Sequence, residues 1–490
     1  MKDIAIPDPR HSTVIAPVDE ILPVTQMILY GLQHVLVMYT GAVAVPLVVG
    51  NTVGLPPEHI ILLISADLFI CGIATIIQSF GITPWLGCKM PLIQGCTFAA
   101  LIPMVLIGKE YGISGISGAV IISGIFILCY APWTSKLIRF FPKVGMGSIV
   151  TLIGMSIMPV AGGWIGGGSS KMAGFGSPFA LLMAAITLVI ILNIYTVASG
   201  VLKNISVLLG LIIGTILWRF FKPLDFHLVN TTPWLHLPTL MPFARPEFHI
   251  IPIALLSMVM VVVVETMSSM LATGDIVGKK VDASMLRNGL NVCGIATTIC
   301  GCFNLFPYAA FAQNIGLIGL TGVRSRFVVS VSGIILILMG VFAKLAALVV
   351  LIPNPILGGA GIVMFGMVAV SGIRTLGQVD YRNNNNGIVV ALTLGLGMMP
   401  AMVPNLFTQF PPMLQLFLHS GITVGTLTAI VASLALNGSA PFRITRDAPV
   451  PDPAPPSSAA RNMAVRTVRM WLLLRKIQKE QQGEALKGKS

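Results

Sequence analysis

Long apolar segments recur along this chain of 490 residues, and they exclude most soluble folds. About 20 apolar residues suffice to cross the hydrocarbon core of a bilayer as a helix. Hydrophobic residues make up 55% of the chain and charged residues 10%, with a mean hydropathy of +0.90. The sequence therefore predicts an all-α membrane protein with fourteen transmembrane segments. They lie near 21–49, 58–83, 91–108, 113–133, 137–161, 177–199, 203–221, 250–278, 286–303, 309–321, 326–348, 351–376, 386–402 and 416–437.

Basic residues are distributed unevenly between the two sets of loops that alternating spans create. If both termini lie on one side, that side holds 24 of the 30 Lys and Arg residues, and the other side holds six. Cytoplasmic loops carry the excess of basic residues in membrane proteins. We therefore expect a multi-pass protein of the inner membrane with both termini in the cytoplasm. The net charge of +13 then requires no nucleic-acid partner.

Two of the apolar segments are short and interrupted by polar residues and glycine. They are Pro91–Pro103, PLIQGCTFAALIP, and Phe306–Gly322, FPYAAFAQNIGLIGLTG, the third and the tenth in the count. Because three and ten differ by seven, the chain divides into two repeats of seven spans, and repeats with an odd number of spans insert in opposite orientations. Broken helices at membrane depth are tolerated where they line a binding site. The pattern predicts an inverted-repeat carrier with its site between the two breaks.

Residues suited to metal binding or nucleophilic catalysis do not cluster in the sequence. The seven cysteines show no paired CxxC spacing, and the seven histidines are scattered. We expect no metal, no cofactor and no catalytic residue, which disfavours an integral-membrane enzyme. A channel is the other alternative class, and it would conduct solute without saturation.

Glu265 follows the uncharged run Ile250–Val264, well inside the eighth segment. A charged side chain at that depth costs roughly 2.5 to 3.5 kcal/mol by insertion scales, so an intramembrane acid usually faces a cavity, binds substrate or carries a proton. The alternative is a structural acid that is bonded to a neighbouring helix. We interpret Glu265 as a ligand of the transported solute.

Polar and aromatic residues at the two breaks are the other candidate ligands. The amides of Gln313 and Asn314 match a flat heterocycle that presents N–H and C=O groups at its edge, and their alternative role is to cap or brace the half-helix. Thr97 follows Gly95 in the opposing break. Phe98, beside it, offers a ring that can stack on a planar base, although phenylalanine in such segments usually packs against core or lipid.

Two further polar residues lie within apolar segments. His34, in the first segment, is a candidate proton relay, or a hydrogen-bonding residue that holds two helices together. Asp67, in the second segment, is a second candidate intramembrane acid. We expect either residue to assist proton coupling.

Several motifs in consecutive order resemble the nucleobase-ascorbate transporter family over essentially the whole chain. QNIGLIGLTGV from Gln313 is similar to the family signature, and the pair Gln33–His34 resembles its second motif. Four further segments resemble the bacterial uric acid and xanthine permeases of this family in particular. They are ETMSSMLATGDIVGKK from Glu265, LGGAGIVMFGM from Leu357, LHSGI from Leu418 and the tail VRTVRMWLLLRK from Val465.

The resemblance implies a core domain beside a gate domain, with dimers formed through the gate. The divisions are a cytoplasmic segment 1–20, core 21–133, gate 134–222, core 250–348, gate 349–437, and a cytoplasmic Pro-rich linker with a basic amphipathic tail at 438–490. We expect that tail to lie on the anionic leaflet or on the inner face of the carrier.

Carried over by position, the resemblance makes Glu265 and Gln313 ligands of a purine, Phe98 its stacking partner and Thr97 a selectivity position, with His34 and Asn314 in support. The sequence departs from many relatives at Cys293, twenty residues before Gln313, where they have an aspartate. A neutral thiol does not replace a carboxylate in proton exchange. Gly322 stands where some relatives have a basic residue, which leaves the substrate range open.

These inferences predict uptake of a purine together with a proton by alternating access. Urate is the first expectation, xanthine or a uracil-type nucleobase the alternative. A carrier of anions with the same architecture is a further alternative, although it would have little use for an acid at its site.

Overall fold

A computed structural model describes residues 16–133, 142–168, 174–252, 260–382 and 384–437. All of them belong to one compact unit, Met1–Ala440. The predicted N-terminal segment lies mostly outside the described residues, and the linker and amphipathic tail at 438–490 lie entirely outside them.

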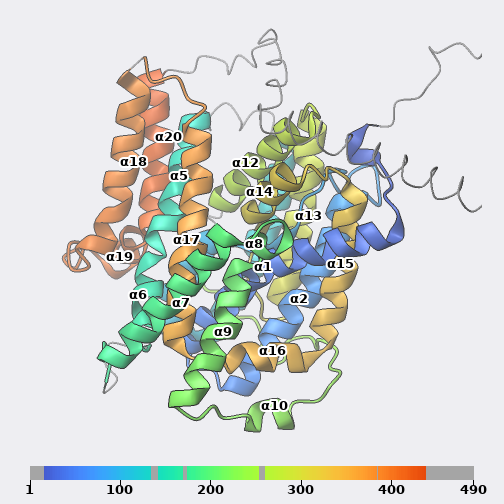
Figure 1. Cartoon of the computed structure of the whole chain (residues 1–490). Coiled ribbons are helices and arrows are strands. Elements are labelled where there is room, and N and C mark those ends of the chain that lie inside the picture. Colours follow the sequence, from blue (N-terminus) through green and yellow to red (C-terminus); the bar gives the residue numbers. More distant parts are fainter. Residues whose placement is uncertain (1–15, 134–141, 169–173, 253–259, 383, 438–490) are drawn as a thin grey trace, which may run out of the picture. The chain divides into compact units, whose positions relative to one another are not determined.

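Helices dominate this unit, as the apolar segments predict (Figure 1). Before the tenth predicted segment the elements are η2 Pro17–Asp19, α1 Val24–Val53, α2 Pro57–Phe80, β1 Gln94–Cys96, η3 Phe98–Ala100, α3 Leu101–Tyr130, η4 Ala131–Trp133, α5 Lys143–Ser156, α6 Met158–Ile165, α7 Pro178–Val197, α8 Val201–Asn204, α9 Ser206–Phe221, α10 His227–Thr231, α12 Met260–Val277 and α13 Ala283–Cys302. The remaining elements are β2 Tyr308–Ala310, α14 Ala312–Thr321, α15 Arg326–Val341, α16 Ala343–Val350, α17 Asn354–Leu376, α18 Asn384–Met402, α19 Pro412–His419 and α20 Gly421–Asn437.

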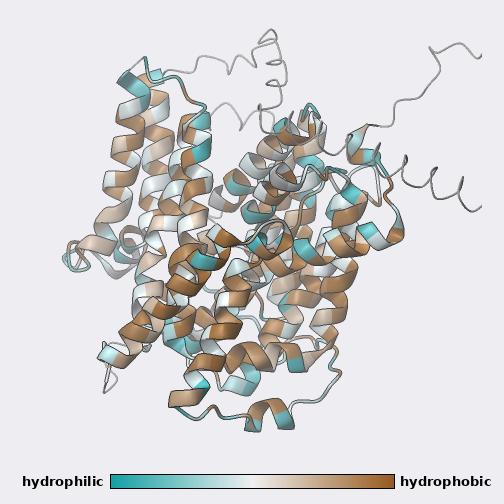
Figure 2. Ribbon diagram, viewed as in Figure 1, coloured by the Kyte–Doolittle hydropathy of each residue, from teal (hydrophilic) through white to brown (hydrophobic). Residues whose placement is uncertain are grey.

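Seven helices in the described residues are long and apolar enough to cross a membrane, or eight if the bent pair α15 and α16 forms one span. Hydrophobic residues extend along the helices, whereas hydrophilic residues gather at helix ends and in loops (Figure 2). Large apolar side chains such as Phe220 on α9 and Val197 at the end of α7 are exposed, as expected for surfaces that contact lipid rather than water.

The backbone departs from a straight helix at two places, one between predicted segments and one within a predicted segment. Gly112 has non-helical φ of 62° and ψ of −165° inside α3, so it separates the third predicted segment from the fourth. The eleventh predicted segment is not one straight helix, because α15 and α16 meet at a bend of 76°. The carbonyl of Val341 there accepts a hydrogen bond of 2.9 Å from the amide of His236 in a distant loop.

The helices pack in two recurring groups. Helix α2 packs along α15 and α3 along α13, while α5 packs against α17 and α18, and α18 against α20. Glycines permit close approach in both groups: a Cβ at Gly72 of α2 or Gly372 of α17 would overlap the backbone of the facing helix. Helices α1, α12 and α14 contribute contacts between the groups.

The all-α prediction needs one correction, which concerns the two breaks. Each break contains a three-residue strand, and β1 pairs with β2 in an antiparallel register that places Gln94 opposite Ala310 and Cys96 opposite Tyr308. Backbone N–H and C=O groups at membrane depth must find partners within the protein. The two non-helical segments therefore satisfy each other.

Candidate functional site

The paired strands bring the starts of two short helical segments together. Beyond β1 the chain turns into η3 and α3, and beyond β2 it turns into α14. Two further backbone bonds of 2.9 Å extend the pairing, from Thr97 N to Pro307 O and from Phe311 N to Ile93 O. The first N–H groups of a helix lack partners within that helix, so such an arrangement presents donors and partial positive charge to a ligand.

A narrow pocket lies at this crossing, with about 250 Å³ of space between its atoms. Its walls come from both strands, from the segments that follow them, and from α12 and α17. The lining residues are Gly95, Cys96, Thr97, Phe98, Glu265, Ala309, Ala310, Phe311, Gln313 and Val368. Four residues that the sequence predicts as substrate ligands, Thr97, Phe98, Glu265 and Gln313, are thus collected around one space.

Glu265 reaches the pocket from α12, and its side chain is only 8% exposed. The hydroxyl of Thr97 donates a hydrogen bond of 2.5 Å to its Oε2. The same Thr97 oxygen accepts a bond of 2.9 Å from the amide of Ala99 and so caps η3. No ion pair to Glu265 and no metal-binding cluster occurs within the described ranges. The carboxyl is therefore buried beside a neutral donor and faces a cavity.

Phe98 and Gln313 supply a flat apolar surface and an amide edge. Phe98 is buried, and its ring meets Phe365 in a T-shaped contact with centroids 5.4 Å apart. Gln313 is half-buried in the first turn of α14, and its amide makes no hydrogen bond within the part of the chain that the structure describes. It therefore does not cap α14, and its donors and acceptor remain available to a ligand.

His34 and Asn314 lie outside the lining and brace the site. The Asn314 side chain donates from Nδ2 to the backbone oxygen of His34 at 2.9 Å, and the same atom lies 3.1 Å from His34 Nδ1. Helix α14 is thereby tied to α1. Asn314 makes a bond of the bracing kind and no capping bond, and its contact with a ligand stays a prediction.

Asp67 is buried in α2 and also lies outside the lining. The hydroxyl of Tyr308 donates to its Oδ1 at 3.0 Å, and the thiol of Cys96 donates to its Oδ2 at 3.4 Å. Because Cys96 and Tyr308 are cross-strand partners, one carboxyl holds both strands at the crossing.

Cys293 stands close behind the site on α13. Its Sγ lies 3.5 Å from Thr266 Oγ1 and donates to Gln94 Oε1 at 3.3 Å. It touches the residue that follows Glu265 and the first residue of β1, but it does not line the pocket.

Phe311 and Val368 are lining residues that sequence reasoning missed. The Phe311 ring is held between two glycines, since a Cβ on Gly41 of α1 would lie 2.9 Å from it and a Cβ on Gly95 would lie 2.8 Å from it. An aromatic residue just before the signature and a glycine in the opposing break are the only signals that pointed to this packing. Val368, on α17, carries no polar signal.

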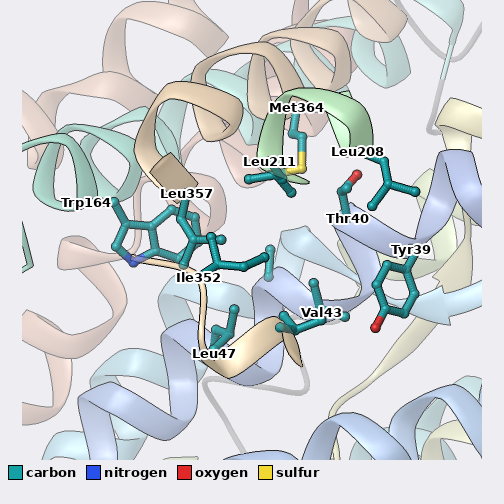
Figure 3. A pocket seen from close by; sticks show the side chains of 12 residues that line it. Tyr39, Thr40, Val43, Leu47, Trp164, Leu208, Leu211, Ile352, Leu357 and Met364 are labelled. Carbon is teal, nitrogen blue, oxygen red and sulfur yellow. The ribbon is translucent and has the colours of Figure 1, made fainter. Parts of the chain in front are cut away.

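A second cavity, with about 350 Å³ of space, lies between α1 and helices that include α6, α9 and α17 (Figure 3). Apart from Tyr39 and Thr40, its lining side chains are hydrophobic, Trp164 among them. The Tyr39 hydroxyl already donates to Leu345 O at 3.2 Å. A heterocycle with several N–H and C=O groups would leave them unpaired here, which is costly.

Comparisons with known proteins agree on the class of molecule. A model described as the Permease family matches residues 25–406. The uric acid transporter UacT of Escherichia coli is 42% identical over 471 residues, which cover 95% of this chain and 96% of that protein. The xanthine permease of Bacillus subtilis is 40% identical over 408 residues, 83% of this chain and 93% of that one.

Solved structures of membrane transporters share the fold at low sequence identity. The transmembrane domain of the cyanobacterial bicarbonate transporter BicA aligns with a TM-score of 0.54 at 15% identity, over 83% of this chain and 96% of that one. The murine anion transporter Slc26a9 in the inward-facing state aligns with a TM-score of 0.55 at 12% identity, over 86% and 70%.

Proposed function

This chain belongs to the Permease family, in its nucleobase-ascorbate transporter branch, and we propose that it imports a purine, urate foremost, together with a proton. Membership places it among transporters rather than enzymes. The observation that carries the proposal is the buried carboxyl of Glu265, which meets Thr97, Phe98 and Gln313 around one pocket where two broken segments cross.

Each lining group has a task that suits a purine. The Gln313 amide and the Glu265 carboxyl can bond to ring N–H and C=O groups, because both can accept and the amide can also donate. The Phe98 ring can stack on the flat base. Thr97 fixes the Glu265 carboxyl and so contributes to selectivity. The relatives named for uric acid, xanthine and nucleobases support this class of substrate.

Proton coupling follows from the charge of the proposed substrate. Urate is largely anionic near neutral pH, and an ionised carboxylate facing it would repel it. A Glu265 that carries a proton removes that repulsion and can donate a hydrogen bond to the purine. The proton then crosses with the urate, and both leave on the cytoplasmic side. We assign His34, Asn314 and Asp67 supporting roles in this cycle, through the bonds that join α1 to α14 and the two strands to α2.

The architecture that we propose is fourteen spans in two inverted repeats of seven. Core and gate domains divide the chain at the boundaries given by the sequence, with a homodimer formed through the gate. The paired breaks, the two groups of packed helices and the fold shared with transporters support this proposal. The excess of basic residues supports an inner-membrane protein with both termini in the cytoplasm.

Two alternatives have specific support. Xanthine is favoured by the 40% identical xanthine permease, and its ring offers a similar pattern of donors and acceptors. An anion carrier is suggested by the fold of the bicarbonate and Slc26a9 transporters, but an acid in the site argues against an inorganic anion.

Uptake of labelled urate into proteoliposomes that contain the purified chain tests the proposal. We expect saturable accumulation that is lost when the proton gradient is collapsed, and competition by unlabelled xanthine that exceeds competition by uracil. Accumulation that is insensitive to the gradient would contradict proton coupling. Failure of every purine to be transported or to compete would contradict the substrate class.

A further inference from the structure

An apolar groove runs along the outside of the helix pair α2 and α13, away from the purine site. The space between its lining atoms, including the part open to the surroundings, is about 520 Å³, and the lining residues are all hydrophobic. On α2, Ile73 and Ile77 recur at helical spacing, and on α13 Val292, Ala296 and Ile299 do the same. The groove is open to its surroundings, since Ile73 is 38% exposed and Ile299 is 42% exposed.

The length of the groove matches one leaflet of a bilayer. Its lining extends from Val292 on α13 to Phe303, the residue just after the end of that helix, a rise of about 16 Å at 1.5 Å per residue. Half of the hydrocarbon core is about 15 Å thick. The groove therefore has the reach of a single acyl chain, from a head-group region to the midplane.

The end of the groove nearest Leu86 is closed by a fixed loop. The side-chain amide of Asn288 donates to Pro84 O at 2.9 Å, and that of Asn291 donates to Trp85 O at 2.9 Å. The amide of Gly87 donates to Asn288 O at 3.2 Å. Trp85 projects from this loop and is 51% exposed, as expected of a tryptophan at the membrane interface.

Basic residues are neighbours in sequence of the residues that form this closed end. Lys89 follows the loop, Arg287 precedes Asn288 on α13, and Lys279 donates from Nζ to Lys89 O at 3.3 Å. No ion pair uses Lys89, Lys280 or Arg287 among the residues described. Asp282, the nearby acid, accepts instead from the Met285 amide and the Ser284 hydroxyl. Lys89 and Arg287 at the closed end therefore carry positive charge that no acidic side chain pairs with among the described residues, whereas Lys279 interacts with Asp282.

We propose that an anionic phospholipid binds here, with one acyl chain in the groove between α2 and α13 and its phosphate on Lys89 and Arg287. The basic bias of cytoplasmic loops explains the sign of the charge, but it does not explain an apolar channel of leaflet length that ends beside that charge. The lipid lies on the outer face of the proposed core domain, so its presence is independent of the substrate carried.

The thermal stability of the purified full chain in detergent, with added dioleoyl phosphatidylglycerol or dioleoyl phosphatidylcholine, tests this site. A ligand that binds the folded state raises its Tm. We expect phosphatidylglycerol to raise the Tm by about 2 to 5 °C more than phosphatidylcholine does. Equal shifts from the two lipids would overturn the proposal.

Matched variants distinguish the contact with the acyl chain of the lipid from the contact with its head group. Ile73→Trp fills the groove and should remove most of the gain from phosphatidylglycerol, whereas Ile334→Trp, on the exposed face of α15, should keep it. Lys89→Gln with Arg287→Gln should abolish the preference for phosphatidylglycerol, whereas Lys109→Gln with Arg245→Gln should not. If Ile73→Trp and the double variant Lys89→Gln with Arg287→Gln both kept the full Tm increase from phosphatidylglycerol, the proposed site would be wrong.

Native mass spectrometry of the wild type gives a readout that needs no variant. We expect the protein to retain phosphatidylglycerol in preference to phosphatidylcholine, and equal retention of the two lipids contradicts the proposal.

Discussion

Thr97 and Glu265 are separated by 168 residues in the chain and are joined by a hydrogen bond of 2.5 Å from the threonine hydroxyl to Oε2 of the carboxyl. The bond joins the residue after β1 to α12, so the Glu265 carboxyl is held at the N-terminal end of η3 and cannot rotate freely. Because Thr97 also caps η3, one hydroxyl positions both the carboxyl and the first turn that follows the break.

Replacement of this hydroxyl should weaken purine transport in a graded way. Thr97→Val preserves the shape and removes the bond, and a net bond between neutral partners contributes roughly 0.5 to 1.5 kcal/mol, so we expect kcat/KM for urate to fall about 2- to 10-fold. Thr97→Ser keeps the hydroxyl and should stay near the wild-type value. Full kcat/KM in Thr97→Val, or a loss in Thr97→Ser as large as the loss in Thr97→Val, would contradict a specific role for the bond.

The bond between α1 and α14 distinguishes the two roles open to His34. Asn314 donates to the backbone of His34 as well as to its ring, so His34→Phe should retain most of the brace, whereas Asn314→Ala should lose all of it. We expect urate uptake to fall about tenfold more in Asn314→Ala. Uptake in both variants, measured at several pH values, checks this. A larger loss in His34→Phe, with an altered pH profile, would identify His34 as a proton carrier.

Crowding of the Phe311 ring should narrow the range of substrates. A Cβ at Gly41 would come within 2.9 Å of the ring, so Gly41→Ala should push Phe311 into the pocket and raise the KM for urate severalfold. Gly162→Ala, on α6, meets nothing within 4 Å and serves as the control. Competition assays with purines of different size provide the measurement, and an unchanged KM in Gly41→Ala would refute the steric argument.

Cys293 should tolerate serine. Its thiol donates to Gln94 Oε1, and a hydroxyl can make the same bond without adding a charge, so we expect Cys293→Ser to keep urate uptake within about twofold of the wild type. If Cys293→Ser lost proton-driven accumulation while keeping urate binding, the thiol would have a direct part in coupling.

The locations of the breaks could be predicted from sequence because glycine, proline and amide residues interrupt apolar runs at membrane depth. The pairing of β1 with β2 could not, since three-residue strands have no periodicity to detect. The position of Glu265 and Gln313 in the pocket lining could be predicted because a buried carboxyl and an amide at a break are costly without a use. Phe311 and Val368 were not, because apolar lining residues resemble any other core residue before the helices are placed.

The bend between α15 and α16 could not be predicted from the sequence either. No proline marks Arg326–Val350, and the segment reads as one continuous apolar span. The bend coincides with a bond that the amide of His236 donates to Val341 O. His236 lies more than a hundred residues before Val341 in the chain, so local sequence patterns cannot predict this bond or the bend beside it.

Urate transport by Glu265→Gln, measured together with proton uptake in proteoliposomes, tests the central claim most directly. Glutamine keeps the size of the side chain and an acceptor for Thr97, but it cannot exchange a proton. Asp275→Asn, an exposed acid on the same helix, is the control. We predict that Glu265→Gln inserts normally and loses gradient-driven urate accumulation by at least about 100-fold, while Asp275→Asn retains it. Normal, saturable and proton-driven accumulation in Glu265→Gln would contradict the account.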